Sequence, residues 1–401
     1  MKKDSFSKVF GDYIIIIFCI AVLLWLGNKI PFLNSIYFFF SNLGVFLFIS
    51  LFFLVFIVAP VGILWQKWLK NKEINKESKK ILLSGVKPTG RVHIGNYFGA
   101  MKQMVDLQDK YESYIFIADY HAMTTVQNKA ELTQGIIDVA LNYLAIGLDP
   151  KKITLFKQSD IPQVTELTWI FNCITTVPYL MRAHAFKDAE AKNKEINVGL
   201  FDYPMLMTSD ILMQDADIVP VGQDQKQHVE YARDTAQKFN RIFGETFKIP
   251  EPYILPNVET VPGIDGRKMS KSYDNEIPLF ATDEEIKKLV MKIPTDSKGV
   301  AESKNPDESI IFTIHKLLLD AEGQKTLREK YQKGGMGYKE AKELLIKDLS
   351  VFIKPMREKR EKLAKDLFAV FEILKNGAKV ASINAEKKMK EVREKVGVEI
   401  Y

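Results

Sequence analysis

The sequence predicts an α/β protein in three parts: an apolar N-terminal leader with one or two transmembrane helices, a body built on a parallel sheet, and an all-helical C-terminal region. Three observations predict this order. Charged residues are scarce in the first 66 positions, short apolar runs alternate with helical patterns in the middle of the chain, and only helical periodicity continues after Ile277. The predicted limits are 1–78, 79–275 and 276–401.

The leader is predicted from the distribution of charge. The 401 residues include 56 Lys or Arg and 50 Asp or Glu, and only six of these 106 charges lie at positions 1–66. The other 100 charges fall on the remaining 335 residues, which are therefore about 30% charged. An apolar leader is joined to a highly charged body.

Two apolar runs in the leader are candidate membrane spans. Residues 43–65 carry no charge and can cross a hydrocarbon core about 30 Å thick. The earlier run is shorter and spans only if it extends back past Asp12, so the predicted spans are about 10–27 and 43–65. Lysines before the first run and after the second place both ends, and the body, on the cytoplasmic side of the membrane. A single span, a signal peptide or an upstream frame wrongly joined to the gene are the alternatives.

The cysteine and histidine contents argue against a disulfide scaffold and against a structural metal. Cys19 and Cys173 are the two cysteines, so a reducing compartment is the default. The five histidines have no ligand spacing such as HExxH. The net charge of +6 and the pI of about 8.9 permit a polyanionic partner without requiring one.

The body alternates predicted strands with predicted helices. This alternation favours a parallel sheet with crossover helices. The expected strands are 81–84, 114–118, 153–156 and 217–221, and the expected helices are 97–107, 130–146 and 223–239.

The C-terminal third is predicted to be helical throughout. Thr282 and Glu285 form a capping box, an apolar stripe through Leu345 continues until Pro355 kinks or ends the helix, and a further stripe over 363–374 is closed by Asn376-Gly377. By composition alone, the basic residues of this region form a solvated helix face; they are Lys354, Arg357, Lys359, Arg360, Lys362 and Lys365.

Two segments have the chemistry of a nucleotide site. Residues 84–96 form a glycine-rich turn between a strand and a helix, where the positive helix N-terminus can face phosphate, although such a segment is often only a turn. The turn is neither a GxxxxGK[ST] loop nor GxGxxG. Residues 268–272, Lys-Met-Ser-Lys-Ser, place two lysines three positions apart in a loop that suits a triphosphate.

Together, His93-Ile94-Gly95-Asn96 and the lysine segment at 268–272 resemble the paired signatures of class I aminoacyl-tRNA synthetases. The stretch from about Lys80 to Tyr401 is most similar to bacterial-type tryptophanyl-tRNA synthetases, through further blocks that include 119–122, 203–212 and 217–228. The resemblance implies a Rossmann-like catalytic domain at 79–275 and an anticodon-binding domain at 276–401. It also implies L-tryptophan, ATP with Mg²⁺ and tRNA(Trp) as substrates, and a homodimer. The leader is foreign to this family.

One helical face is predicted to hold the amino acid. Tyr203, Met207 and Asp210 share that face by their spacing. A buried carboxylate that accepts a hydrogen bond from the indole N–H would select tryptophan, because it costs several kcal/mol when left unpaired. By resemblance, the thioether of Met207 favours tryptophan where relatives that activate tyrosine carry Gln. The resemblance adds Gly85, His121, Val219, Val221 and Gln225 to this pocket.

The resemblance also assigns the ATP site and the catalytic residues. Lys87 stands where many relatives have Gln, and Val261 is expected to face the adenine. No metal ligands are expected. The catalytic set is Thr89, His93, Lys268 and Lys271, and the ATP-binding set is Lys87, Pro88, Thr89, Gly95, Asn96, Gly222, Gln223, Asp224, Val261, Lys268, Met269, Ser270, Lys271 and Ser272.

Three other functions stay open at this point. The first is a membrane-tethered enzyme that forms an adenylate for an acceptor other than tRNA. The second is a non-catalytic binding protein built on a synthetase body. The third is a tyrosine-specific synthetase. Pyrophosphate exchange and tRNA charging with each amino acid distinguish them.

Overall fold

The computed structural model describes residues 79–400, apart from 89, 193–194, 223–225 and 255–260. The leader and its predicted spans at about 10–27 and 43–65 lie outside the described residues. Among the helices that are described, none combines the length and apolar character that a membrane span requires.

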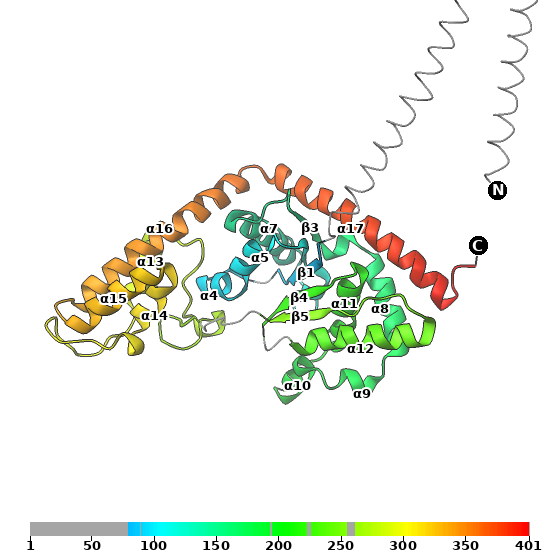
Figure 1. Ribbon diagram of the computed structural model, residues 1–401, viewed down its shortest axis with the longest axis horizontal. Helices are drawn as coiled ribbons and strands as arrows, with labels where there is room; N and C mark the ends of the chain where they lie inside the picture. Colours follow the sequence, from blue (N-terminus) through cyan, green and yellow to red (C-terminus); the bar gives the residue numbers. More distant parts are fainter. Residues whose placement is uncertain (1–78, 89, 193–194, 223–225, 255–260, 401) are drawn as a thin grey trace, which may run out of the picture. The chain divides into compact units, whose positions relative to one another are not determined.

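A parallel sheet lies at the centre of the described body, with strand order β3-β2-β1-β4-β5 (Figure 1). The four predicted strands are confirmed. The last strand was missed because it is an edge strand that begins with Glu251 and has no fully buried residue, so it is not an apolar run. The strands are β1 (Ile81–Val86), β2 (Glu112–Ile117), β3 (Ile153–Lys157), β4 (Ile218–Val221) and β5 (Glu251–Ile254).

Both faces of the sheet are buried, which explains why its strands are continuous apolar runs. Leu82 and Ile115 point into one core, and Leu83 and Tyr114 point into the other. The first core continues without a break into the C-terminal helices through residues such as Leu345. The domain limit at 275/276 therefore does not separate two independent cores, and it stays a prediction.

Helices connect the strands and cover both faces. The predicted helix at 97–107 is observed as two consecutive segments, the first of them a π-helical turn in which the rings of Tyr97 and Phe98 both contact Phe352. The segments before β5 are α4 (Ile94–Asn96), η3 (Tyr97–Met101), α5 (Lys102–Leu107), α6 (Asp119–Ala122), α7 (Lys129–Ile146), η4 (Gln158–Asp160), α8 (Gln163–Ile174), α9 (Val177–Leu180), α10 (His184–Ala191), α11 (Val198–Met213) and α12 (Lys226–Phe243).

The C-terminal region is helical, as predicted. Thr282 caps the first of these helices by accepting from the Glu285 amide at 3.2 Å, but the Glu285 carboxylate pairs with Arg91 instead of closing a capping box. The segments after β5 are η6 (Lys271–Tyr273), α13 (Asp283–Met291), η7 (Pro306–Glu308), α14 (Ile310–His315), η8 (Lys316–Leu318), α15 (Ala321–Lys333), α16 (Tyr338–Ala364) and α17 (Leu367–Val396).

Two local predictions about the C-terminal helices are wrong, and a third is narrowed. Helix α16 continues through Pro355, so this proline does not end the helix; it is exposed, and water can satisfy the carbonyl that loses its donor. The apolar stripe over 363–374 belongs to two helices, because Asp366 begins α17 as an N-cap. Gly377 does not end a helix. It lies where α17 crosses β3, and a Cβ there would be 1.9 Å from the carbonyl oxygen of Leu155.

Candidate active site

The order of the strands identifies the part of the carboxyl edge of the sheet where a ligand is expected. The chain moves outward from β1 to β2 and β3, then returns to place β4 on the other side of β1. Ligands bind open sheets of this kind where the direction reverses. Gly85 lies near the end of β1 and is exposed although β1 is the central strand. The four polypeptide segments that follow β1, β2, β3 and β4 all reach this edge.

The segment after β1 ends in a tightly built helix start. His93 is the N-cap of α4: its Nδ1 accepts from the Asn96 amide at 3.2 Å, and the Asn96 side chain accepts from the His93 amide at 3.1 Å. The His93 pKa is lowered to about 4, first by burial and then by the nearby Lys271 charge. Since Nδ1 accepts, the ring proton of neutral His93 is on Nε2, which is a hydrogen-bond donor.

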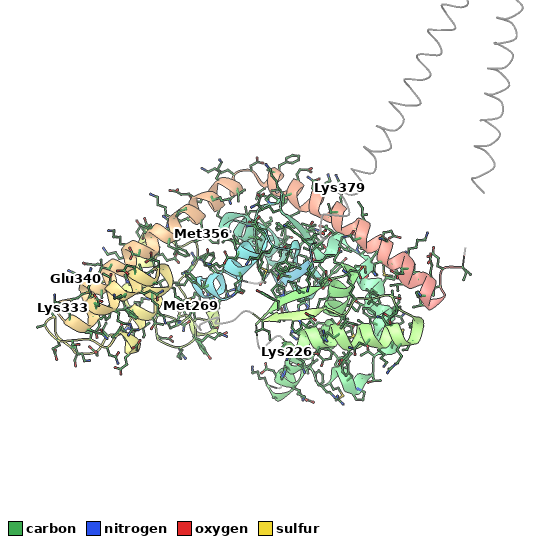
Figure 2. All side chains as sticks on the ribbon, in the orientation of Figure 1. Lys226, Met269, Lys333, Glu340, Met356 and Lys379 are labelled. Carbon is green, nitrogen blue, oxygen red and sulfur yellow. The ribbon has the colours of Figure 1, made fainter. Side chains whose placement is uncertain are left out.

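The two predicted signature segments meet. Strand-like pairing joins residues 92–94 to 277–279, with the Ile94 amide donating to the Ile277 carbonyl at 3.0 Å. A Cβ on Gly95 would lie 3.3 Å from Cβ of Met269, and a Cβ on Gly90 would lie 2.2 Å from Nζ of Lys271. Met269 is buried in the core that joins the sheet to the C-terminal helices, where it is labelled in Figure 2. The glycine-rich turn (residues 84–96) and the lysine segment at 268–272, called the lysine loop below, are therefore in contact.

Asn275 organises the lysine loop, and it was missed from sequence. Its side chain is buried, accepts from the Ser270 amide at 2.8 Å, and donates to the Asp265 carboxylate at 2.7 Å and the Lys268 carbonyl at 3.2 Å. Ser270 also caps η6 by accepting from the Ser272 amide. These contacts hold the loop backbone while the side chains of Lys268 and Lys271 remain exposed. No local sequence signal marks Asn275, because its partners become neighbours only in the fold.

The predicted amino-acid pocket is assembled on α11. Tyr203 and Asp210 are buried and Met207 is half-buried, as their shared face predicts. The His121 ring, from α6, stands edge-on to the Tyr203 ring with centroids 5.0 Å apart. The Tyr203 hydroxyl lies 2.9 Å from Nε2 of His228. His228 is not one of the predicted tryptophan-binding residues, but this contact holds the Tyr203 side chain.

The charge state of the pocket follows from its burial. Desolvation raises the pKa of Asp210 well above its ordinary value, a hydrogen bond from Gln158 lowers it, and the charge of Asp119 adds to the rise. Burial lowers the pKa of His121 to about 4, helped by Lys87 and His228. Burial thus favours the neutral form of both the His121 imidazole and the Asp210 carboxyl group.

Gln158 is the second residue that sequence reasoning missed. It is 1% exposed and its Nε2 donates to Oδ2 of Asp210 at 2.7 Å. A signal was available, because Gln158 lies two residues after the predicted strand 153–156 and directly after the observed β3, at the carboxyl edge of the sheet.

Of the remaining predicted site residues, some lie in the part of the chain that the structure describes and some lie outside it. Val219 and Val261 are buried, Val221 is half-buried and Gly222 is exposed at the end of β4. The Val261 carbonyl accepts from the Met269 amide at 3.0 Å, so this residue belongs to the base of the lysine loop. Thr89, Gln223, Asp224 and Gln225 lie outside the described residues.

Lys87 and Pro88 lie just after β1. The Lys87 Nζ donates to the Thr124 hydroxyl at 3.2 Å, and burial lowers its pKa. Pro88 packs on helix α7, where a Cβ on Gly135 would be 2.5 Å from the Pro88 carbonyl oxygen. The glycine-rich turn therefore packs against α7.

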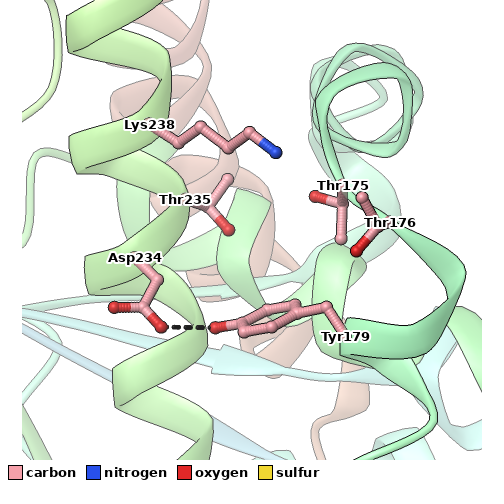
Figure 3. Close-up of a pocket in the computed structure, with 6 residues that line it drawn as sticks. All are labelled: Thr175, Thr176, Tyr179, Asp234, Thr235 and Lys238. Carbon is pink, nitrogen blue, oxygen red and sulfur yellow. Dashed lines mark hydrogen bonds between the residues drawn. The ribbon is translucent and has the colours of Figure 1, made fainter.

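A pocket of about 130 Å³ lies elsewhere, between α8, α9 and α12 (Figure 3). Within it the Tyr179 hydroxyl donates to the Asp234 carboxylate at 2.6 Å. Its volume suits a few water molecules at about 30 Å³ each and is too small for a nucleotide. None of the predicted site residues lines it; the lining residues are Thr175, Thr176, Tyr179, Asp234, Thr235 and Lys238.

Two of the predicted solvated basic residues instead connect α16 to the body. Arg357 donates to the Ala281 carbonyl and pairs with Asp283, and Arg360 pairs with Asp138 of α7. The other four are exposed lysines: Lys354, Lys359, Lys362 and Lys365.

Comparison with known proteins gives consistent matches to this body. A family profile described as tRNA synthetases class I (W and Y) matches residues 75–354. The tryptophan–tRNA ligase of Fusobacterium nucleatum is 49% identical over 317 residues, covering 79% of this chain and 97% of that protein. The tryptophan–tRNA ligase of Rhodopirellula baltica is 47% identical over 300 residues, covering 75% and 94%. A crystal structure of tryptophanyl-tRNA synthetase from Campylobacter jejuni, complexed with ADP and tryptophan, is 45% identical with a TM-score of 0.76, covering 79% and 99%.

Proposed function

The chain belongs to the tRNA synthetases of class I (W and Y), and from that membership we infer that it joins L-tryptophan to tRNA(Trp) with the conversion of ATP to AMP and diphosphate. The observation that carries this function is the contact between the two signature segments. Gly95 and His93 lie against Met269 and Lys271, so groups that suit a triphosphate converge from positions about 175 residues apart in the sequence.

The first reaction is an in-line displacement. A carboxylate oxygen of tryptophan attacks the α-phosphorus of ATP, and the bond to the bridging oxygen of the diphosphate breaks. The chain contributes position and charge, with no covalent nucleophile. The Nε2–H of neutral His93 donates to a phosphate oxygen, while Lys268 and Lys271 follow the charge that develops on the leaving diphosphate. Magnesium would enter with ATP as part of the substrate and would neutralise phosphate charge, beside the positive charge that Lys268 and Lys271 supply.

Thr89, Asn96, Gly222, Gln223 and Asp224 complete the nucleotide site in this proposal. The Asn96 side chain accepts from the His93 amide and so fixes the helix start beside which the phosphates are proposed to lie. Gly222 is exposed at the end of β4, where a ribose can approach the backbone.

Asp210 accepts the indole N–H and Met207 lies against the ring, while Gln225 holds the polar end of the amino acid. The burial of Asp210 supports this role, because a substrate without an N–H would leave the carboxylate desolvated and unpaired. In the second reaction the 2′-hydroxyl of the terminal adenosine of tRNA attacks the acyl carbon, and AMP leaves.

The helical region at 276–401 binds the tRNA anticodon in this proposal. The exposed side chains of Lys354, Lys359, Lys362 and Lys365 support it. Replacing Lys359 and Lys362 with Glu should weaken tRNA charging and leave tryptophan-dependent pyrophosphate exchange unchanged. Equal loss of both activities would count against a role in tRNA binding.

A homodimer is the proposed assembly. Exposed apolar side chains on α8 and α9 support it: Trp169 is 71% exposed and Val177 is 60% exposed. We place the second copy on this face. Size-exclusion chromatography with light scattering should give a dimer, and Trp169→Lys should give a monomer with intact helical content. A wild-type monomer at micromolar concentration would exclude this assembly.

The leader is proposed to anchor the enzyme to the inner face of the cytoplasmic membrane through spans at about 10–27 and 43–65. The support is the uncharged run and the lysines beyond it. The full-length chain should sediment with membranes, resist a carbonate wash and be released by detergent. Recovery in the supernatant would reject the anchor and leave the enzymatic proposal intact.

Tryptophan-dependent ATP–pyrophosphate exchange, followed by charging of tRNA, tests the proposed function directly. Full-length protein and residues 79–401 should both charge tRNA with tryptophan and discriminate strongly against tyrosine. Exchange without charging would indicate another acceptor. No exchange with either amino acid would overturn the proposal.

A further inference from the structure

We propose that Gln158 is a positioning residue for tryptophan recognition: its side-chain amide holds one oxygen of Asp210 so that the other remains aimed at the indole N–H. This inference rests on the proposed function and deepens it, because it explains how a carboxylate in an apolar pocket stays oriented and able to accept.

The geometry of Gln158 allows only one orientation of its amide. The Oε1 atom accepts from the His121 backbone amide at 3.1 Å, and Nε2 donates to Oδ2 of Asp210 at 2.7 Å. A flipped amide would place its NH₂ against the His121 N–H, a donor against a donor. Gln158 therefore connects the segment after β2 to helix α11 through two bonds of defined direction.

The backbone beside Gln158 is held independently. Asp119 accepts from the Ser159 amide at 2.9 Å and from the Ser159 hydroxyl at 2.5 Å. The turn η4 is thereby fixed to the start of α6, and Gln158 has little room to move because it is 1% exposed. Because its backbone is fixed to the edge of the sheet, Gln158 can hold the Asp210 carboxylate in one position.

The hydrogen bond also bears on the charge of Asp210. Burial favours the protonated carboxyl, and the bond from Gln158 favours the carboxylate. Only the ionised form is an acceptor at both oxygens. A protonated Asp210 could turn an O–H toward the indole N–H, which would place a donor against a donor.

Two variants of Gln158 and one control test this role in the full-length chain. Q158L removes both hydrogen bonds with little change in volume. Q158E keeps the shape but places a second carboxyl beside Asp210, so that the pair must share a proton. Q214L is the matched control, since Gln214 is equally buried and donates to the Ala381 carbonyl at 3.2 Å away from the pocket.

The decisive readouts are pyrophosphate exchange with tryptophan and with 3-benzothienylalanine, in which sulfur replaces the indole N–H. For Q158L we expect kcat/KM for tryptophan to fall about 10- to 100-fold, with KM for ATP unchanged. The preference for tryptophan over the analogue should shrink at least tenfold. The acid limb of the kcat/KM profile should move to higher pH in both Gln158 variants. Q214L should match wild type in kcat/KM for tryptophan, in the preference for tryptophan over the analogue and in the acid limb.

A purely structural role predicts different results. If Q158L and Q158E lose thermal stability but keep the wild-type analogue preference and acid limb, the positioning role is wrong. If wild-type protein shows no tryptophan-dependent exchange, the proposed function fails first and this inference fails with it. An active wild type with unaltered Gln158 variants overturns the inference alone.

Discussion

Gly95 and Met269 are in contact across the two signature segments: a Cβ on Gly95 would lie 3.3 Å from Cβ of Met269 and 2.9 Å from Nδ1 of His93. The contact leaves no space for a side chain at the start of α4. Placement of the lysine loop and orientation of the His93 ring therefore depend on the same glycine.

Gly95→Ala should impair ATP use without unfolding the protein. The added methyl must displace the His93 ring or the loop, so we expect kcat/KM for ATP to fall at least tenfold while KM for tryptophan changes less than threefold. Pyrophosphate exchange at varied ATP and tryptophan measures both. Gly199→Ala on α11 is the control, because its Cβ would meet nothing closer than 3.4 Å. Equal ATP kinetics for the two variants would contradict the proposed role of the contact.

Asp210→Asn should remove tryptophan activation selectively. The Asn amide would either face the Gln158 NH₂ or turn its own NH₂ toward the indole N–H, so one donor is left facing another. We expect kcat/KM for tryptophan to fall about 100-fold or more, with KM for ATP retained. Asp202→Asn, on the same helix but bonded to Asn172, is the control. A loss of less than threefold in Asp210→Asn would exclude the acceptor role.

Lys268→Ala and Lys271→Ala should each slow tryptophan activation in single-turnover assays. In the proposed mechanism each lysine stabilises charge on the departing diphosphate, and loss of one such contact typically costs about 100- to 1000-fold in rate. Tryptophan binding, followed by calorimetry without ATP, should be unaffected. Lys287→Ala on the exposed side of α13 is the control. Wild-type rates in both lysine variants would refute the function of the loop.

The sheet and the signature segments could be predicted because their signals are local. Strands buried on both faces must be apolar, so β1 to β4 appear as short apolar runs. The pairing of Gly95 with Met269 was accessible only by resemblance, since residues so far apart in the chain have no shared pattern. Strand β5 was missed because it is not an apolar run: it begins with Glu251, lies at the edge of the sheet, and none of its residues is fully buried.

The errors lie where tertiary contacts decide. Asn376-Gly377 has the form of a helix end, but Gly377 is needed because α17 touches the backbone of β3. Gln158 is marked only by its place after a strand, because its partners His121 and Asp210 are distant in sequence. Asn275 bonds residues of its own loop, and no motif identifies it. Local patterns predict which elements form, whereas these buried polar side chains are explained only by their neighbours in space.

Gly377→Ala should destabilise the body. Because a Cβ would lie 1.9 Å from the Leu155 carbonyl oxygen, α17 must move away from β3, at a cost of about 2–3 kcal/mol in the free energy of unfolding. Thermal and urea unfolding measure the loss. The neighbouring Asn376→Ala is exposed and should be neutral or slightly stabilising. If the two variants have equal stability, the close approach of helix and strand is wrong.

Mild acid should destabilise the fold through His93 and His121. Both have pKa values lowered to about 4 by burial, against an ordinary value of 6.5. Between pH 6.5 and 4 the two histidines are protonated in the unfolded chain and neutral in the folded chain. The stability that they contribute is therefore complete above pH 6.5 and is lost as the pH falls toward 4. Burial of Asp210 acts in the opposite direction, which makes comparison with variants necessary.

His93→Asn isolates the first histidine, because asparagine is a good N-cap and does not titrate. As the pH falls from 6.5 to 4, the unfolding free energy of wild type should decrease more than that of His93→Asn. His121→Gln should act in the same way, and the double variant should have the flattest profile. Urea unfolding at several pH values measures these differences. Parallel profiles for wild type and the double variant would show that neither imidazole is held neutral by the fold.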